Sequence, residues 1–153
     1  MPKAENTYAK QVKARVTALR KVVDPITHQL EIRWEPTAKK WMVTSPDGMV
    51  WRGLDKVEWK LVRGEKPDVE AHFQFPDMKL FADFGKQDRL SKDKTAKIGK
   101  REDNLVLQVH ADACRRSNPH YYAVWISDRE HPNGGEFAVG QDLNPPPEVT
   151  VGP

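Results

Sequence analysis

The side chains of this sequence that are best suited to bind a metal ion are one cysteine and five histidines. A blue-copper site combines a Cys, a His shortly after it, a second His upstream and a weak axial Met. Cys114 and His120 are separated by five residues, but no Met follows position 78. Upstream, His72 lies on the polar face of its predicted strand, and His110 ends another. We therefore expect no metal and no cofactor, and we interpret these groups as scattered histidines and an inert thiol.

Local signatures of catalysis are missing as well. The sequence contains no Gly-x-Ser-x-Gly, no His-Glu-x-x-His and no glycine-rich phosphate loop, and Gly134-Gly135 belongs to a turn signal. Carboxylate pairs such as Asp55 with Glu58 are typical of solvated strand ends. An active site assembled from distant loops leaves no local motif, so an enzyme stays an alternative. We expect a non-enzymatic protein.

Basic residues gather in two segments although the net charge is only +3. Residues 1–21 hold six Lys or Arg, and residues 86–101 hold seven. Such segments can neutralise phosphates while exposed Trp or Tyr side chains stack on bases, so nucleic-acid binding is an alternative function. In residues 86–101, however, the cations are interleaved with Asp, Ser and Thr and no aromatic residue interrupts them. This mixture is equally typical of a solvated loop.

The composition indicates one globular domain over residues 1–153. Hydrophobic residues make up 38% and charged residues 31%, with 12 Pro and 5 Trp, which suits a β-rich protein with a packed core. The N-terminus lacks an apolar leader, no stretch approaches the ~18 apolar residues of a membrane helix, and the lone Cys fits a reducing compartment. We therefore expect a cytoplasmic protein without membrane contact. Residues 1–10 and 85–103 are expected to be flexible.

Apolar and polar residues alternate with the period of two that is typical of half-buried strands. A turn at residues 45–48 predicts a hairpin between 41–44 and 49–51, and the last strand is expected at an edge. Eight or nine short strands without a long helix predict an all-β fold, an immunoglobulin-like or cupredoxin-like Greek-key β-sandwich. These eight or nine strands are expected among eleven candidate segments: residues 12–18, 28–34, 41–44, 49–51, 55–62, 69–75, 78–84, 105–109, 120–127, 136–139 and 148–151.

Residues 120–127 are the one predicted strand that is apolar on both faces. One face carries Tyr122, Val124 and Ile126, and the other carries Tyr121, Ala123 and Trp125. We expect this strand at the centre of a sheet, next to residues 105–110 and 136–139. One face then belongs to the core, and the other is either covered by the chain or used as an interface.

The second apolar face predicts a role in protein interaction or self-assembly, as a homo-oligomer. Tyr and Trp are frequent interface anchors, so Tyr121 and Trp125 are the predicted contact residues, with Val106 beside them. Residues 1–10 or 85–103 folding over this face is the alternative that stays open. An electrostatic contact surface is predicted at Lys92, Lys94, Lys97, Lys100 and Arg101.

The C-terminal residues add a resemblance. Tyr121-Tyr-Ala-Val-Trp-Ile-Ser-Asp128, a Gly-containing turn and Asn144-Pro-Pro-Pro-Glu-Val-Thr-Val-Gly-Pro153 resemble the ending of the DP-EP family, small bacterial immunoglobulin-like sandwich proteins of unknown function. That family shows Asp-Pro before the final strand, where this chain has Asn144-Pro145. The resemblance implies the sandwich fold and no catalytic residues.

Overall fold

The computed structural model describes residues 25–45, 50–77, 79–84, 87–113, 120–129, 135–140 and 147–151. Every regular element within these ranges is a strand. No helix among them is long and apolar enough to cross a membrane. The strands are β1 (Thr27–Glu35), β2 (Lys40–Thr44), β3 (Val50–Trp51), β4 (Lys56–Val62), β5 (Glu70–Gln74), β6 (Phe81–Ala82), β7 (Thr95–Ile98), β8 (Asn104–Val109), β9 (His120–Tyr121), β10 (Ala123–Ser127), β11 (Glu136–Phe137) and β12 (Glu148–Val151).

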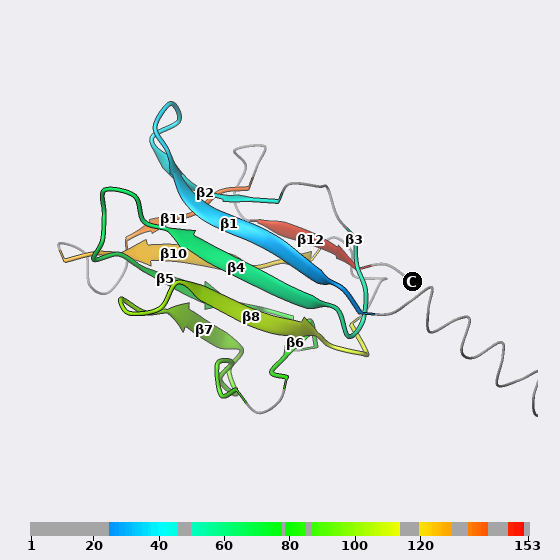
Figure 1. Ribbon diagram of the computed structural model, residues 1–153. Coiled ribbons are helices and arrows are strands. Elements are labelled where there is room, and N and C mark those ends of the chain that lie inside the picture. Colours follow the sequence, from blue (N-terminus) through cyan, green and yellow to red (C-terminus); the bar gives the residue numbers. More distant parts are fainter. Residues whose placement is uncertain are drawn as a thin grey trace, which may run out of the picture.

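Two sheets face each other across one core, so the predicted β-sandwich is confirmed (Figure 1). The front sheet has the order β2-β1-β4-β8-β6, and the back sheet has the order β11-β10-β5-β7. A smaller end sheet has the order β3-β12-β9. Strands β1 and β4 pair in parallel, as do β3 and β12. The immunoglobulin-like or cupredoxin-like topology stays a prediction.

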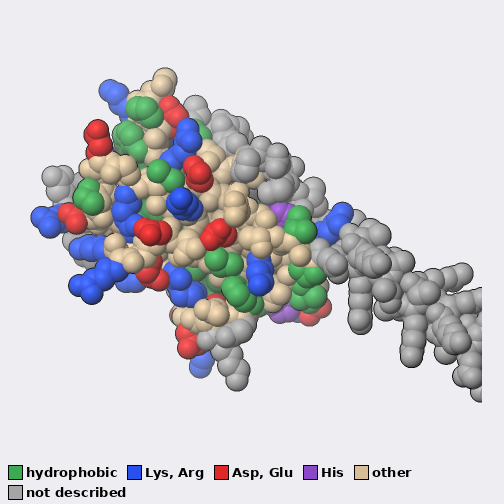
Figure 2. All heavy atoms as spheres, viewed as in Figure 1, with side chains coloured by type: hydrophobic (Ala, Val, Ile, Leu, Met, Phe, Trp, Pro, Cys, Tyr) green, Lys and Arg blue, Asp and Glu red, His purple; other side chains and the backbone are tan. Residues whose placement is uncertain are grey.

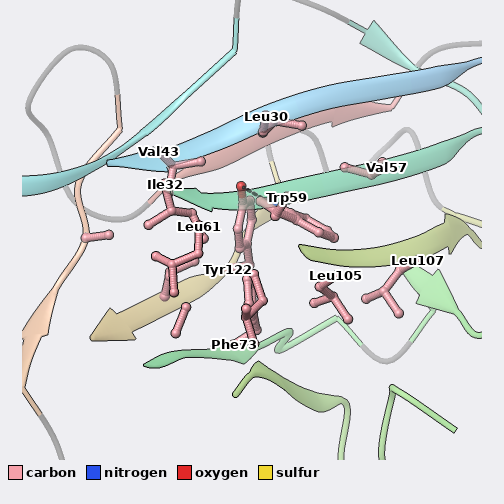
Figure 3. Close-up of a cluster of buried hydrophobic side chains, with 14 of the residues drawn as sticks. Leu30, Ile32, Val43, Val57, Trp59, Leu61, Phe73, Leu105, Leu107 and Tyr122 are labelled. Atoms are coloured by element: carbon pink, nitrogen blue, oxygen red, sulfur yellow. Dashed lines mark hydrogen bonds between the residues drawn. The ribbon is translucent and has the colours of Figure 1, made fainter. Parts of the chain in front are cut away.

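The core lies between the inner faces of the two large sheets. Trp59, on the central strand β4, is fully buried and donates its Nε1–H to the hydroxyl oxygen of Tyr122 at 3.1 Å (Figure 3). Burial raises the pKa of Tyr122, so its hydroxyl stays neutral. Around this pair lie Leu30, Ile32, Val57, Leu61, Ala71, Phe73, Phe75, Phe81, Leu105, Leu107, Val124 and Ile126.

A buried carboxylate ties the start of β1 to the turn before β4. Asp55 accepts hydrogen bonds from the backbone N–H groups of Ile26 at 3.1 Å and Arg52 at 3.0 Å. Its second oxygen also lies 2.6 Å from Nε2 of His28, which is buried beside it. These contacts satisfy a carboxylate that would otherwise be costly to bury. The sequence analysis placed Asp55 at a solvated strand end, and this was wrong.

The two large sheets are linked at both of their edges. On one side, Val139 accepts a hydrogen bond from the backbone N–H of Val43 at 2.9 Å and donates to the carbonyl of Trp41 at 3.0 Å. On the other side, Arg89 donates through Nη2 to the carbonyls of Lys97 in β7 and Asn104 in β8, at 3.0 and 3.1 Å. Both links tie a strand of the front sheet to the chain of the back sheet.

Several predicted pairings are wrong. Strand β10 is an inner strand as expected, and it pairs with β11, but its second neighbour is β5 and not residues 105–110. Val106 lies in the front sheet opposite Glu58, so it does not lie beside Trp125.

The predictions for the end sheet are wrong as well. Strand β3 pairs with β12 and not with β2, and β12 is the middle strand of the end sheet and not an edge. Strand partners depend on contacts between distant residues, which alternation does not encode.

The segment 85–103 was also expected to be a loop, yet it contains β7. This strand pairs with β5 along its whole length, and Ile98 is fully buried. Asp83 fixes the start of the connection by accepting hydrogen bonds from the backbone N–H groups of Arg89 and Leu90, at 3.3 and 2.9 Å. Predictions for residues 1–10 and 12–18 and for Cys114 lie outside the described residues.

Candidate functional site

The outer face of the back sheet carries a row of four side chains, one from each strand. Trp125 in β10 is opposite Phe137 in β11 on one side and His72 in β5 on the other, and His72 is opposite Lys97 in β7. We call Phe137, Trp125, His72 and Lys97 the aromatic row. Residues directly opposite each other on adjacent strands point to the same face, so the register alone places these four side chains together.

The alternation of β10 confirms which side faces solvent. Val124 and Ile126 are buried in the core, while Trp125 between them is only half-buried. Phe137 is 64% exposed, the highest value among the large apolar side chains that the structure describes as exposed. Trp125 and Phe137 therefore form an apolar outer face that is open to solvent at Phe137, whereas Tyr121, predicted on the same face as Trp125, lies in β9 of the end sheet.

The rings of the row pack against one another. His72 and Trp125 are stacked, with ring centroids 5.4 Å apart and an angle of 13° between the ring planes. Phe137 is tilted by 53° against Trp125 at 6.1 Å. Ring pairs at these distances add stability beyond their buried area.

A hydrogen bond fixes the imidazole within the row. Nε2 of His72 lies 2.8 Å from Oγ of Ser127, on the neighbouring strand β10. Burial lowers the pKa of His72; nearby Glu70 opposes this change and Lys97 adds to it. The imidazole is thus mainly uncharged at neutral pH. Lys97 itself lies 3.8 Å from a carboxylate oxygen of Glu70.

A serine hydroxyl next to a neutral histidine is the pairing that activates a nucleophile in hydrolases. Here Ser127 is only 3% exposed, and one face of the His72 ring is stacked on Trp125. The hydroxyl is thus poorly accessible to a substrate. Its evident contribution is to fix the orientation of the His72 imidazole through this hydrogen bond.

The outer face of the front sheet differs in kind. Acidic and basic side chains are intermixed across it (Figure 2), among them Glu31, Arg33, Glu58 and Lys60. A groove of about 630 Å³ crosses this face and is lined by carboxylates, cations and amides. Glu58 within it already accepts a hydrogen bond from Asn104 at 2.7 Å. This face has no counterpart of the aromatic row among its described residues.

The structure brings together two of the predicted contact residues, Trp125 and Lys97, in one row. Tyr121 is 47% exposed, but it belongs to β9 in the end sheet, four residues along the chain from Trp125. The other predicted cations lie at the two ends of β7, in the turns before and after it. These are Lys92, Lys94, Lys100 and Arg101.

Sequence reasoning missed His72 and Phe137 as members of the site. His72 alternates with Glu70 and Gln74, so it was assigned to a polar strand face with no special role. Phe137 follows the predicted turn at residues 131–135, and the register of that hairpin places it opposite Trp125. An Asn133-Gly134 two-residue turn would pair Trp125 with residue 142, so the turn signal did not indicate Phe137. No local signal indicated that β5 is the neighbour of β10.

The described residues contain no group of three or more His, Cys, Asp or Glu side chains arranged to hold a metal ion. His120 is buried, and its Nδ1 lies 2.8 Å from a carboxylate oxygen of Asp77. His28 and His72 likewise contact Asp55 and Ser127. Three of the histidines considered for metal binding thus have protein partners.

Comparison with known proteins gives no family to which the chain can be assigned. Neither the protein-family models nor the curated proteins compared with this sequence match it. The resemblance to the DP-EP family therefore stays a prediction.

Proposed function

We propose that this protein is a non-enzymatic protein-interaction or self-assembly module, and that it makes contact through the aromatic row on the back sheet. The observation that carries the proposal is the exposure of Phe137 beside the stacked rings of Trp125 and His72. Aromatic side chains clustered on a sheet face, with a cation and a carboxylate at the margin, have the composition of an interface core with a polar rim.

The contrast between the two sheet faces supports this proposal. The front sheet exposes intermixed charges such as Glu31 and Lys60, which suits a surface in contact with water (Figure 2). The back sheet replaces them with aromatic rings at the positions where alternation places solvent-facing side chains. Trp125 gains ring stacking with His72 within the monomer, whereas Phe137 stays 64% exposed, so most of its apolar surface is available to a partner.

Site-specific photocrosslinking tests the proposal whether the contact is with another protein or with a second copy. A photoreactive phenylalanine analogue replaces Phe137 in one variant and Val62, 37% exposed on the front-sheet strand β4, in the matched control. We expect discrete crosslinked protein adducts from position 137 and none from position 62. Equal labelling at both positions, or none at either, contradicts the proposal.

Nucleic-acid binding is a second candidate, supported by the cations at the two ends of β7. Lys92, Lys100 and Arg101 are exposed in the turns before and after β7, the strand that carries Lys97 of the aromatic row. Cations combined with aromatic rings are typical of single-strand binding surfaces. Affinity for a random oligonucleotide would then fall steeply as salt rises. An absence of binding at low salt removes this candidate and leaves the first untouched.

A further inference from the structure

The aromatic row has two different ends. Phe137 presents an exposed ring at one end, Lys97 presents an ammonium group at the other, and Trp125 and His72 lie stacked between them. Suppose that a second copy of the row lies against the first in the opposite order. A lysine then faces a phenylalanine ring at each end, and Trp125 and His72 face each other in the middle. The row is therefore complementary to its own reverse.

We propose that the occupant of this face is a second copy of the chain, related by a two-fold axis that runs parallel to the strands and passes between Trp125 and His72. This inference rests on the proposed function and specifies its partner. A two-fold axis makes each contact twice, so Phe137 of each copy lies against Lys97 of the other, and each Trp125 lies against a His72. A lysine ammonium over an aromatic face is an attractive contact.

Two sheets packed face to face can be related by a two-fold axis parallel to the strands or by one along the row. Charge repulsion favours the axis parallel to the strands. An axis along the row itself would place Lys97 opposite Lys97 of the second copy, which brings like charges together. With the axis parallel to the strands, the two ammonium groups lie at opposite ends of the interface. Glu70, 3.8 Å from Lys97 within each chain, helps to balance each ammonium group.

The positions that flank the row fit the same axis. Ser127 is opposite Glu70 across the two inner strands, and Ala123 is opposite Gln74. The two-fold axis places Ala123 against Gln74 of the second copy, so a small side chain meets a long one in this flanking row. On the other side, Ser127 is only 3% exposed, so Glu70 of the second copy meets little protruding side chain there.

Association through a sheet face is also favoured because two of the sheet edges, at β7 and β2, are occupied. At β7, Arg89 donates to the carbonyl of Lys97, and the backbone N–H of Ser91 donates to the carbonyl of Thr95 at 2.9 Å. At β2, the backbone of Val139 takes up the free edge. Strand addition needs unpaired edge groups, and these edges offer few.

The expected dimer is weak. Four strands spaced ~4.8 Å apart span only ~15 Å, and a standard interface buries about 800 Å² on each partner. The aromatic row and its two flanking rows cover less than a large obligate interface does. We therefore expect a dissociation constant in the micromolar range or weaker, so that the monomer and the dimer exchange at ordinary concentrations.

Two complementary variants test the arrangement. Lys97→Glu places a carboxylate against Phe137 of the other copy, and Phe137→Lys places two ammonium groups together at each end. We expect each variant alone to dimerise at least about tenfold more weakly than the wild type. In an equimolar mixture of the two variants, the carboxylate introduced at position 97 faces the ammonium introduced at position 137 at one end of the interface. The native Phe137 and Lys97 meet at the other end, so we expect the two variants to form a heterodimer.

Sedimentation equilibrium measures the mass in solution of the wild type, of each variant and of the mixture. Lys60→Glu on the front sheet is the control, and we expect it to associate as the wild type does. Melting temperatures verify that each variant is folded. A wild type that stays monomeric at about 1 mM, where even a millimolar dissociation constant leaves much dimer, overturns the inference. So does a mixture that stays monomeric. Photocrosslinks from position 137 to another protein would still support the proposed function, so the two failures are distinguishable.

Discussion

At the scale of single residues, His72 connects the fold to the proposed contact. Its ring is stacked on Trp125 and bonded to Ser127, so its position is fixed by two partners on one neighbouring strand. Burial lowers its pKa from the usual 6.5, which means that the folded chain binds the proton less readily than the unfolded chain. Acid therefore acts against the folded state at this position.

The pH dependence of stability follows from the sign of this shift. Above pH 6.5 neither state holds the proton at His72, and its contribution to stability is complete. As the pH falls below 6.5, the unfolded state takes up the proton first, so stability declines until the folded state is protonated as well. We predict that melting temperature drops less between neutral and mildly acidic pH in His72→Gln than in the wild type. An equal or larger drop in the variant contradicts this assignment.

At the scale of elements, Arg89 holds the seam where β7 of the back sheet meets β8 of the front sheet. Its guanidinium donates to one carbonyl on each strand and lies 3.0 Å from a carboxylate oxygen of Glu102. Strand β7 buries only Ile98 fully, so it depends on this clamp more than the longer strands do. The clamp in turn keeps Lys97 at its position in the aromatic row.

We predict that Arg89→Ala lowers the free energy of unfolding by about 1–3 kcal/mol, since two carbonyls lose a charged donor. Arg33→Ala is the matched control, because its only described ion pair, with Glu31 at 3.9 Å, is exposed and such pairs contribute about 0–1 kcal/mol. Denaturant unfolding of both variants measures the difference. Equal losses would show that the seam does not depend on Arg89.

The element scale also shows how far the sequence predicts the structure. Strict alternation predicted β1, β4, β5 and β8 within one or two residues, because one face of each is core. The single strand predicted over residues 120–127 is divided into β9 of the end sheet and β10 of the back sheet. Strand β7 was missed because a short, lysine-rich segment with a single large apolar residue gives no periodic signal. Its formation depends on the partner strand β5 and on Arg89. Of the aromatic row, alternation predicted Trp125 and the cluster of cations predicted Lys97. Their position in one row with His72 and Phe137 depends on strand pairing, which neither pattern encodes.

At the scale of the whole molecule, the two sheet faces divide the surface into unlike halves. The front sheet intermixes charges (Figure 2). The outer face of the back sheet carries Trp125 and His72 between Phe137 and Lys97. The modest net charge of +3 does not by itself keep two copies apart. The account thus predicts one preferred contact surface, on the back sheet.

Hydroxyl-radical footprinting of the purified protein over a range of concentrations tests this central claim most directly. The account predicts that oxidation of Phe137 and Trp125 falls as concentration rises through the dissociation constant, because the second copy covers the row. Oxidation of Ile26 and Leu54, exposed side chains outside the back sheet, stays constant and serves as the internal control. The contradicting result is that the oxidation of Phe137 and Trp125 does not change with concentration, as expected for Ile26 and Leu54.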